Sequence, residues 1–277
     1  MADKITTLGL IAGNRSLPLL VASQARATGI QRIVAAAFEN ETDPKLSALV
    51  DEIKWLRVGQ LSALIEAFQS WGVRHCVMAG QSAPKNLFDL RPDLRSMKLL
   101  FRIKEKNAQS LFGAIADELK KEGIELISAI PWLGPMMPSA GFSLGSKLSE
   151  SQASDIQFGA HIAKEVSRLE IGQTVVVKAG TVLAVEGFEG TDACLRRGGE
   201  LAGKSGEAVA VKAARQGHDL RFDIPCVGPT TVEICMASGI QVLAVEAGRT
   251  LVLEREQIQT LTARKRFTLA TFQTPSP

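Results

Sequence analysis

Residues 7–14 read Thr-Leu-Gly-Leu-Ile-Ala-Gly-Asn, an apolar run that stops at a Gly-Asn turn signal. A segment of helical spacing follows, with Ser16 as the expected N-cap, Pro18 in its first turn and Gly29 beyond its end. Four more apolar, strand-like runs follow at residues 33–38, 53–58, 73–79 and 124–130. Helix-like segments lie between them. Strands that alternate with helices indicate a parallel sheet covered on both faces. Residues 1–131 are therefore predicted to form a doubly wound, Rossmann-like α/β domain that binds a nucleotide or phosphate.

The second half of the chain has a different pattern. Three prolines and three glycines between residues 131 and 145 interrupt the alternation, which predicts an interdomain linker over residues 132–149. Beyond it, short β-like runs, a hairpin signal and helices follow one another in mixed order, so residues 150–277 are predicted to form an α+β domain. Its expected elements include a strand at 220–224 and helices at 157–169, 192–197 (ended by Gly198-Gly199), 230–238 and 256–264.

The composition indicates a globular protein without a nucleic-acid surface. Of 277 residues 45% are hydrophobic, and the net charge is +3, with no basic stripe interleaved with aromatic residues. The four cysteines form no C-x-x-C pair, which predicts buried free thiols in a reducing compartment. The sequence shows neither a secretory leader nor an apolar run of roughly 20 residues. We therefore expect a cytoplasmic protein that binds no nucleic acid.

Gly13 and Asn14 lie where the first predicted strand meets the first helix. In a doubly wound sheet this turn borders the ligand crevice, and its backbone amides can bind a phosphate or nucleotide. The spacing differs from G-x-G-x-x-G, so the dinucleotide fingerprint is absent. Glu39, just after the second predicted strand, still leaves open an NAD-dependent oxidoreductase in which it would bind the ribose. A tight turn without a ligand is the structural alternative.

A carboxylate-rich turn precedes the next short predicted helix. Glu189 lies between small turn residues, a position that scaffolding does not explain, and it is predicted to bind a metal ion together with Asp192. Thr191 is a candidate substrate-binding residue, although Thr191 or Asp192 could instead cap the helix. Lys178 and Lys212 each end a valine-rich run, where an ammonium group suits a phosphate and a solvated strand end is the alternative.

The stretch Asp219-Leu-Arg-Phe-Asp-Ile-Pro225 alternates polar and apolar residues as a strand does. Asp219 and Asp223 would then share one face about 13 Å apart, too far to bind the same metal ion. Asp223 is predicted to be the ligand, because Pro225 ends the strand beside it; a surface strand with an Arg221–Asp pair is the alternative. Thr230 begins a capping-box pattern, and the helix N-terminus that it orients would attract a phosphate.

Clustered acids with an open coordination sphere suit Mg²⁺, which can bridge phosphate oxygens and activate water. The sequence contains no G-x-S-x-G or P-loop motif, so acyl hydrolysis and NTPase chemistry have no anchor. The three histidines are too few and too dispersed for a di-metal phosphoesterase. These patterns favour phosphate chemistry with magnesium as the cofactor. A non-catalytic protein that binds a nucleotide sugar is a further alternative.

Five longer motifs run nearly from end to end of the chain. They are G-L-I-A-G-N at 9–14, V-V-V-K-A-G-T-V-L-A-V-E at 175–186, E-G-T-D-A at 189–193, D-L-R-F-D-I-P-x-x-G-P-x-T at 219–231 and V-E-A-G-R-T-L at 245–251. Together they make the chain similar to the UDP-2,3-diacylglucosamine pyrophosphatases of the LpxI type. The C-terminal motifs are long, and they are far more specific than a three-glycine pattern.

The resemblance implies a Mg²⁺-dependent hydrolase of lipid A biosynthesis that acts on UDP-2,3-diacylglucosamine. Its products are UMP and 2,3-diacylglucosamine 1-phosphate (lipid X), and its ligand is held between a Rossmann-like domain and a family-specific catalytic domain. The resemblance places the essential aspartate of the R-F-D-x-P motif at Asp223, and extends with less support to Asp219, Lys212, Glu189 and Asp192. It also implies that water attacks the sugar-side phosphorus. A peripheral contact with the inner face of the inner membrane is expected, and a homodimer is left open.

Three departures from the family pattern fall in or near these motifs. Arg15 follows Gly-Asn where the family often has glycine, which adds a charge at the turn. Residues 81–85, Gln-Ser-Ala-Pro-Lys, replace a basic element, which removes one expected phosphate or uridine contact. Residues 213–215, Ala-Ala-Arg, stand where a lysine–proline pair is common, so the local charge is kept while the backbone differs.

Overall fold

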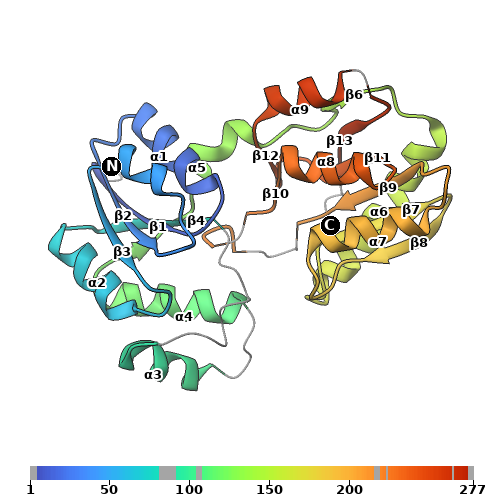
Figure 1. Cartoon of the computed structure of the whole chain (residues 1–277). Coiled ribbons are helices and arrows are strands. Elements are labelled where there is room, and N and C mark those ends of the chain that lie inside the picture. The colour runs from blue at the N-terminus through green and yellow to red at the C-terminus, as the bar shows by residue number, and fades with distance from the viewer. Residues whose placement is uncertain are drawn as a thin grey trace. The chain divides into compact units, whose positions relative to one another are not determined.

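The computed structural model describes residues 5–80, 92–103, 108–214, 219–222, 224–263 and 265–273. The chain folds into two compact units (Figure 1). The N-terminal unit comprises Met1–Leu133 together with Asp219–Asp223, and the C-terminal unit comprises Gly134–His218 and Ile224–Pro277. The first boundary lies close to the end of the expected N-terminal domain. The short return of Asp219–Asp223 to the N-terminal unit, called the excursion below, was not expected from the sequence.

The N-terminal unit contains the predicted parallel sheet. Its five strands lie in the order β3-β2-β1-β4-β5, and each neighbouring pair is parallel. Because β1 pairs with β2 on one side and β4 on the other, the chain changes direction across the sheet between these strands. The strands are β1 (Thr7–Ala12), β2 (Arg32–Phe38), β3 (Glu52–Leu56), β4 (His75–Ala79) and β5 (Glu125–Leu126).

Helices cover both faces of this sheet, which explains why its central strands are apolar throughout. Figure 1 shows α1 and α5 on one face and α2 and α4 on the other. One core cluster joins Ile11 and Val34 of the sheet to Phe68 of α2 and Leu119 of α4. The helices are α1 (Leu17–Ala27), the 3₁₀ helix η1 (Pro44–Ala48), α2 (Leu61–Ser70), α3 (Leu94–Arg102), α4 (Ala108–Lys121) and α5 (Ile130–Leu133).

The C-terminal unit is built on a mixed sheet in the order β6-β13-β11-β9-β7-β8. The strands β13, β11 and β9 are parallel, whereas β6, β7 and β8 join by antiparallel pairing. A separate two-stranded parallel sheet pairs β10 with β12. The strands are β6 (Ser143–Gly145), β7 (Thr174–Lys178), β8 (Thr181–Val185), β9 (Ala208–Lys212), β10 (Cys226–Val227), β11 (Ile240–Glu246), β12 (Leu251–Val252) and β13 (Thr268–Phe272).

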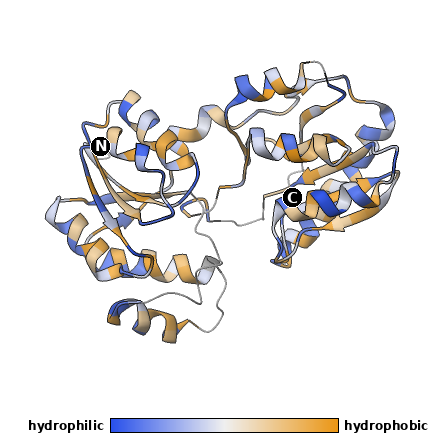
Figure 2. Ribbon diagram, in the orientation of Figure 1, coloured by the Kyte–Doolittle hydropathy of each residue, from blue (hydrophilic) through white to orange (hydrophobic). Residues whose placement is uncertain are grey.

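Two separate core clusters show that this sheet also has helices on both faces. One cluster contains Leu195 of α7, Val232 of α8 and Ile258 of α9, and the other contains Ile156 and Ala163 of α6. Figure 2 shows the strands as largely hydrophobic and the helices as mixed, as this layering requires. The helices are the 3₁₀ helix η3 (Gly134–Met136), α6 (Glu150–Arg168), α7 (Thr191–Leu201), α8 (Pro229–Ala237) and α9 (Arg255–Thr262).

The region expected to be a linker, 132–149, contains ordered parts of both units. Trp132 and Leu133 are buried in the N-terminal unit, and Ser143–Gly145 forms β6, which pairs with β13 at the edge of the C-terminal sheet. Prolines and glycines can occupy edge strands, because an edge strand needs few ladder hydrogen bonds. The sequence pattern missed β6 and β13 because their pairing joins segments more than 120 residues apart.

Gly198 and Gly199 lie within α7 and do not end it, contrary to the prediction. A Cβ atom at Gly198 would lie 2.5 Å from Cβ of Val176, and one at Gly199 would lie 2.1 Å from the carbonyl oxygen of Ser238. These contacts are closer than real Cβ atoms reach, so the glycines let α7 approach β7 and the end of α8. The pair therefore marks close packing of a helix, which a sequence cannot distinguish from a helix end.

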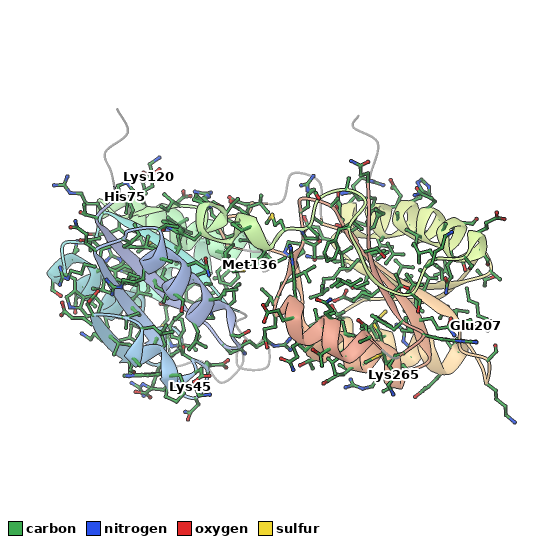
Figure 3. All side chains as sticks on the ribbon, turned by 90° about the horizontal axis from the view of Figure 1, so that it is seen from above. Lys45, His75, Lys120, Met136, Glu207 and Lys265 are labelled. Atoms are coloured by element: carbon green, nitrogen blue, oxygen red, sulfur yellow. The ribbon has the colours of Figure 1, made fainter. Side chains whose placement is uncertain are left out.

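Charged side chains occupy the outside of each unit. Figure 3 shows Lys45, His75 and Lys120 at the periphery of the N-terminal unit, and Glu207 and Lys265 at that of the C-terminal unit. In the described part of the chain no helix is long and apolar enough to cross a membrane. The cysteines are free, as predicted, and burial raises the pKa of Cys76 and of Cys194 to about 12, so both thiols are unreactive.

Candidate functional site

The turn between β1 and α1 lies at the carboxyl edge of the N-terminal sheet. The amide of Gly13 donates to the carbonyl oxygen of Ala79 over 2.8 Å, which holds the end of β4 against this turn. A Cβ atom at Gly80 would lie 2.6 Å from the carbonyl oxygen of Asn14, and Gly80 has φ of +92°. Only glycine fits there. The two predicted ligand residues, Gly13 and Asn14, are thus held in a tight turn where the sheet reverses its strand order, the usual place for a ligand crevice.

Asn14 has a hydrogen-bonding group without a protein partner in this turn. Its Nδ2 donates to Oε2 of Glu41 over 3.0 Å, whereas its Oδ1 is buried and, among the described residues, has no partner. Ser16 is the N-cap of α1, as predicted, although its side chain makes no capping hydrogen bond. A buried acceptor without a partner is costly. The turn therefore offers a ligand one acceptor and the N-terminal amides of α1.

Residues 220–222 of the excursion form a turn and not the predicted strand. The side chain of Asp219 accepts from the amide of Arg221 over 3.0 Å, and the amide of Phe222 donates to the carbonyl oxygen of Asp219. The Arg221 guanidinium also donates to both carboxylate oxygens of Asp219, an ion pair that the strand alternative anticipated. An aspartate that binds a nearby amide competes with strand pairing, which explains the error. Asp223 lies outside the described residues.

Contacts on both sides fix the excursion to the N-terminal unit. The Phe222 ring lies 6.1 Å from that of Phe112 on α4 and packs against the core cluster. Ser128 donates from Oγ to the carbonyl oxygen of Leu220 over 3.3 Å. Ser128 follows β5, and Gly13 follows β1, so both lie at the carboxyl edge of one parallel sheet. Asp219 is therefore brought to the same edge as the Gly13–Asn14 turn.

In the C-terminal unit, Lys212 and Thr191 meet at the carboxyl edge of the sheet. The Lys212 ammonium donates to Oγ1 of Thr191 over 3.0 Å, and Thr191 donates to Oε1 of Glu186 over 2.9 Å. Lys212 ends β9, and Thr191 begins α7. All three side chains are half-buried. The arrangement places an ammonium group beside a helix N-terminus, where both favour an anion.

Glu189 is already engaged by other groups of the C-terminal unit. Its Oε1 accepts from Arg197 over 2.5 Å and its Oε2 from the Gly187 amide over 3.1 Å. The hydrogen bond from Arg197 lowers the pKa of Glu189 below its ordinary value. Asp192 is the second residue of α7, whose N-cap is Gly190, so neither Thr191 nor Asp192 is the cap.

The predicted magnesium ligands do not form a metal cage in the part of the chain that the structure describes. No group of three His, Cys, Asp or Glu side chains there could hold a metal ion. Glu189 is bound by Arg197, and Asp223 is not described. Because Mg²⁺ commonly takes only one or two protein carboxylates, the magnesium site stays a prediction.

Lys178 and Thr230, both predicted to bind substrate, lie in different surroundings. In the antiparallel register Lys212 is opposite Thr174, so Lys178 lies at the other edge of the sheet. Its ammonium donates to the carbonyl oxygen of Ala202 at the end of α7, as lysines near helix C-termini do. Thr230 is exposed in the first turn of α8, whose N-cap is Gly228, so the capping box is not formed. Since α8 leads directly into the start of β11, its N-terminus lies toward the carboxyl edge that Lys212 occupies.

A buried ion pair that the sequence reasoning missed lies at the same edge of the C-terminal sheet. Glu246, 2% exposed at the end of β11, accepts from the Lys164 ammonium over 2.7 and 2.8 Å. The Lys164 ammonium also donates to the carbonyl oxygen of Ala214, and the Ala214 amide donates to Oε2 of Glu246. A glutamate that directly ends an apolar strand was the available signal, but its partner lies 82 residues away in the chain.

The V-E-A-G-R-T-L motif binds the chain on both sides of the excursion, at Ala214 before it and at Pro225 after it. Glu246 binds Ala214, the last described residue before the excursion. The Leu251 amide donates to the carbonyl oxygen of Pro225, two residues after the excursion, over 2.8 Å. Glu246 and Leu251 are five residues apart, so one short connection fixes both attachment points within the C-terminal unit.

Comparisons with known proteins agree with the two-unit architecture. The family model described as the LpxI N-terminal domain matches residues 7–134, and that of the LpxI C-terminal domain matches residues 139–270. The UDP-2,3-diacylglucosamine pyrophosphatase LpxI of Caulobacter vibrioides is 33% identical over 261 residues. The similarity covers 91% of this chain and 92% of that relative.

Proposed function

The chain belongs to the LpxI family, and we propose that it hydrolyses the pyrophosphate bond of UDP-2,3-diacylglucosamine in lipid A biosynthesis. The products are UMP and 2,3-diacylglucosamine 1-phosphate. The observation that carries this proposal is the match of both family domains, in order, to nearly the whole chain. The same match favours the hydrolase over the NAD-dependent oxidoreductase and over a protein that only binds nucleotide sugars.

The N-terminal unit binds the nucleotide part of the substrate in this proposal. Its strand order and parallel pairing support a Rossmann-like assignment. Gly13 and Asn14 lie at the point where the strand order reverses, and Asn14 has a buried acceptor without a partner among the described residues. A uracil or ribose donor would satisfy that acceptor, and the amides at the start of α1 would bind phosphate oxygens.

The C-terminal unit contributes the Lys212–Thr191 pair to phosphate binding. The Lys212 ammonium is held by a threonine hydroxyl and has two further N–H donors for phosphate oxygens. The N-termini of α7 and α8, with Thr191 and Thr230 in their first turns, support negative charge at this edge. Lys178 lies at the other edge, and its predicted contact with the substrate remains to be tested.

The hydrolysis is a displacement at phosphorus. The oxygen of a water molecule forms a bond to the sugar-side phosphorus while the bridging P–O bond breaks. The former bridging oxygen leaves with the uridine-side phosphate as UMP, the water oxygen stays on the sugar-side phosphorus, and a proton of the attacking water passes to a base. We propose Asp223, the essential aspartate that the family motif implies, as this base, and Asp219, bound to Arg221, as a residue that helps to hold the excursion.

Magnesium remains a separate prediction. When bound, Mg²⁺ would offset negative charge on the diphosphate. Because the described carboxylates supply no three-ligand group, no step of the reaction is assigned to the metal. The acyl chains of the substrate favour a cytoplasmic protein in peripheral contact with the inner membrane, and a homodimer stays a prediction.

The test is UMP release from UDP-2,3-diacylglucosamine by the purified full chain. Wild type should release UMP, EDTA should abolish the release, and added Mg²⁺ should restore it. Asp223→Asn should lower kcat by a factor of about 10³ or more, as removal of a catalytic group does. Asp43→Asn is the matched control, because Asp43 caps η1 and asparagine caps equally well.

Reaction in H₂¹⁸O locates the bond that is cleaved. The label should appear in 2,3-diacylglucosamine 1-phosphate and not in UMP if water attacks the sugar-side phosphorus. Label in UMP would reverse that assignment and keep the hydrolase. Binding of the nucleotide sugar without any product, with Mg²⁺ present, would instead identify a sensor.

A further inference from the structure

The helix α3 presents apolar side chains to solvent. Leu94 is 76% exposed, Met97 41% and Phe101 85%. Their spacing of three and four residues places them on one side of the helix as a continuous stripe. Single exposed apolar residues are ordinary, but three large ones in line mark a contact surface.

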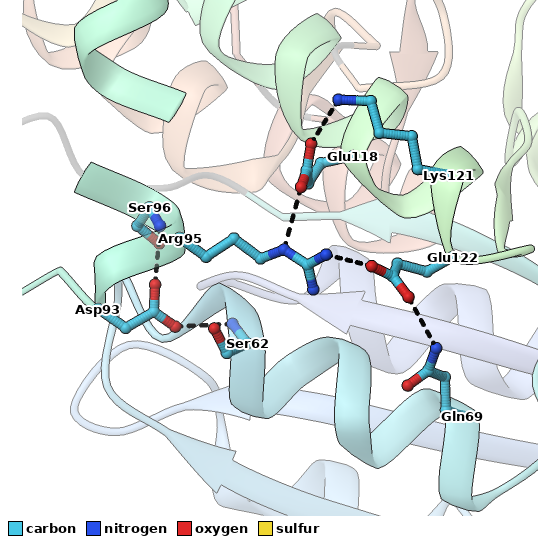
Figure 4. Close-up of polar contacts among 8 residues, drawn as sticks. All are labelled: Ser62, Gln69, Asp93, Arg95, Ser96, Glu118, Lys121 and Glu122. Carbon is cyan, nitrogen blue, oxygen red and sulfur yellow. Dashed lines mark hydrogen bonds and ion pairs between the residues drawn. The ribbon is translucent and has the colours of Figure 1, made fainter. Parts of the chain in front are cut away.

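Polar contacts attach α3 to the rest of the N-terminal unit, and Figure 4 shows them. Asp93 at its N-cap accepts from the amide of Ser96 over 2.8 Å and from the amide of Ser62 on α2 over 2.7 Å. Arg95 donates from Nε to Glu118 of α4 over 3.0 Å and also forms an ion pair with Glu122.

Apolar contact of α3 with its own unit is sparse. Leu99, 8% exposed, is the buried apolar side chain among the described residues of α3, and a groove of about 740 Å³ separates the helix from parts of α2 and α4. An amphipathic helix normally packs its apolar side inward. Here the polar side is attached to the protein, and the apolar side faces outward.

Two cations run beside the apolar stripe. Lys98 and Arg102 are exposed and one helical turn apart, and no carboxylate in the described ranges forms an ion pair with either. The nine residues of α3 include three basic and no acidic side chains. An apolar stripe flanked by cations fits the surface of a bilayer that contains acidic lipids, where chains and headgroups meet.

A second copy of the chain fits this surface less well. In a two-fold dimer the same patch would meet itself. Lys98 and Arg102 of one copy would then approach those of the other, and α3 has no acid to offset them. We propose that α3 is the element by which this protein docks on an acidic membrane surface, with Leu94, Met97 and Phe101 inserted among the lipids. The inference rests on the proposed function, which includes a peripheral membrane contact, and it assigns that contact to α3.

Sedimentation of the full chain with vesicles tests the proposal. Vesicles of phosphatidylglycerol and phosphatidylethanolamine should bind the protein more tightly than vesicles of phosphatidylcholine, and salt should weaken the binding. Leu94→Ser with Phe101→Ser should lower the association constant at least tenfold. Lys98→Gln and Arg102→Gln should each lower it about fivefold at low salt, because each removes one cation from the surface.

The matched control is Leu169→Ser with Ile171→Ser, since these side chains are 56% and 51% exposed in the C-terminal unit. It should bind vesicles as wild type does. Equal binding by the Leu94/Phe101 variant, or equal loss in the control, would overturn the proposal. So would loss of a dimer in the Leu94/Phe101 variant while its vesicle binding is unchanged, because the stripe would then be a contact between copies.

Turnover separates this inference from the proposed function. The Leu94/Phe101 variant should release UMP at the wild-type rate from substrate dispersed in detergent, and more slowly from substrate in vesicles. An equal loss in both would show that α3 contacts the substrate itself and would overturn membrane docking. Wild type that binds vesicles through α3 but releases no UMP would refute the hydrolase and leave the docking surface intact.

Discussion

Glu246 places a carboxylate where almost no solvent reaches it, and its neutralising partner is Lys164. Removal of one partner from a buried pair leaves an uncompensated charge, which typically costs about 3–5 kcal/mol. Since the Lys164 side chain is 20% exposed and can be hydrated, we expect Glu246→Gln to lower the free energy of unfolding by about 2–3 kcal/mol. Urea unfolding measures the change.

The control for this pair is Glu165→Gln, which breaks the exposed ion pair with Arg168. It should cost no more than about 0.5 kcal/mol. Lys164→Met combined with Glu246→Gln should cost less than the sum of the single changes, because the second substitution removes the charge that the first leaves unpaired. Additive costs would show that the two groups do not stabilise one another.

The two valine-run lysines should differ in their effect on activity. Lys212→Gln should lower kcat/KM by a factor of about 10–100, because it removes a charged donor from the phosphate site. Lys178→Gln should change kcat/KM by less than about threefold, since its ammonium binds the end of α7. A larger loss at Lys178 would restore the sequence-based prediction that it binds substrate. The measurement is steady-state UMP release.

Single residues were predictable where their partners are near in sequence. The Asp219–Arg221 pair was anticipated because the two lie two residues apart. The Lys164–Glu246 pair and the Glu189–Arg197 pair were not, because each depends on how strands and helices are packed. Helix ends were predicted less well in detail. Ser16 is the predicted N-cap of α1 but makes no side-chain capping bond, and α8 begins at Gly228 and not at Thr230.

At the scale of elements, replacing Gly198 of α7 with alanine and replacing Gly113 of α4 with alanine should change the stability of the protein in opposite directions. Alanine is favoured over glycine by about 1 kcal/mol inside a helix. Gly113→Ala should therefore stabilise the protein by about 0.5–1 kcal/mol, because no atom lies within 4 Å of the added methyl. Gly198→Ala should destabilise it by about 1–3 kcal/mol through overlap with Val176. Thermal unfolding of both variants decides between packing and helix propensity.

The attachment of α3 should depend on pH through Asp93. Burial alone would raise the pKa of Asp93, but hydrogen bonds from the Ser96 and Ser62 amides outweigh it and hold the pKa below the ordinary value of 3.8. A group with a depressed pKa adds stability above its unfolded pKa, and that stability is lost as the pH falls through the folded pKa. The protection of α3 amides against hydrogen exchange, corrected for the intrinsic effect of pH on the exchange rate, should therefore fall below about pH 4.

Asp93→Ala removes this dependence. It should accelerate exchange in α3 already at pH 7, by about the factor of 5 to 10 that corresponds to the loss of an N-cap worth about 1 kcal/mol. Amides of α6 in the C-terminal unit serve as the internal reference. Unchanged exchange in α3 would show that Arg95 alone holds the helix.

The regular elements were predicted well where a periodic pattern covers a whole strand or helix. β1, β2 and β4 match their predictions within two residues, because each buries a continuous apolar face. Short edge strands such as β6 bury too little for a pattern to appear. The 220–224 segment failed for the opposite reason: its alternation is real, but Phe222 packs into a core from a turn.

At the scale of the whole molecule, Phe222 should stabilise the N-terminal unit, although it lies in the C-terminal half of the sequence. Phe222→Ala should lower the stability of the N-terminal unit by about 2 kcal/mol, because the ring is partly buried against Phe112 and the core. Hydrogen exchange in the Phe222→Ala variant should be faster in β4 and β5 and unchanged in β11. Phe188→Ala is the control, since that ring is 97% exposed.

The change of pattern near residue 131 predicts two domains, and the structure divides into its two units close to that point. The excursion was not predictable, because hydrophobic periodicity assigns a residue to a strand or helix and never to a particular core. The candidate site depends on this unpredicted feature: the motif that carries Asp219 belongs to the C-terminal half by sequence and to the N-terminal unit by contact.

The backbone passes from one unit to the other three times, after Leu133, before Asp219 and after Asp223. Two bodies joined by a single tether can be cut apart, shuffled between genes or shed separately. Three connections prevent this separation, because a break between the halves would part Phe222 from the hydrophobic core against which it packs. The N-terminal half, produced as a separate chain, should therefore be less stable than the same half within the intact protein.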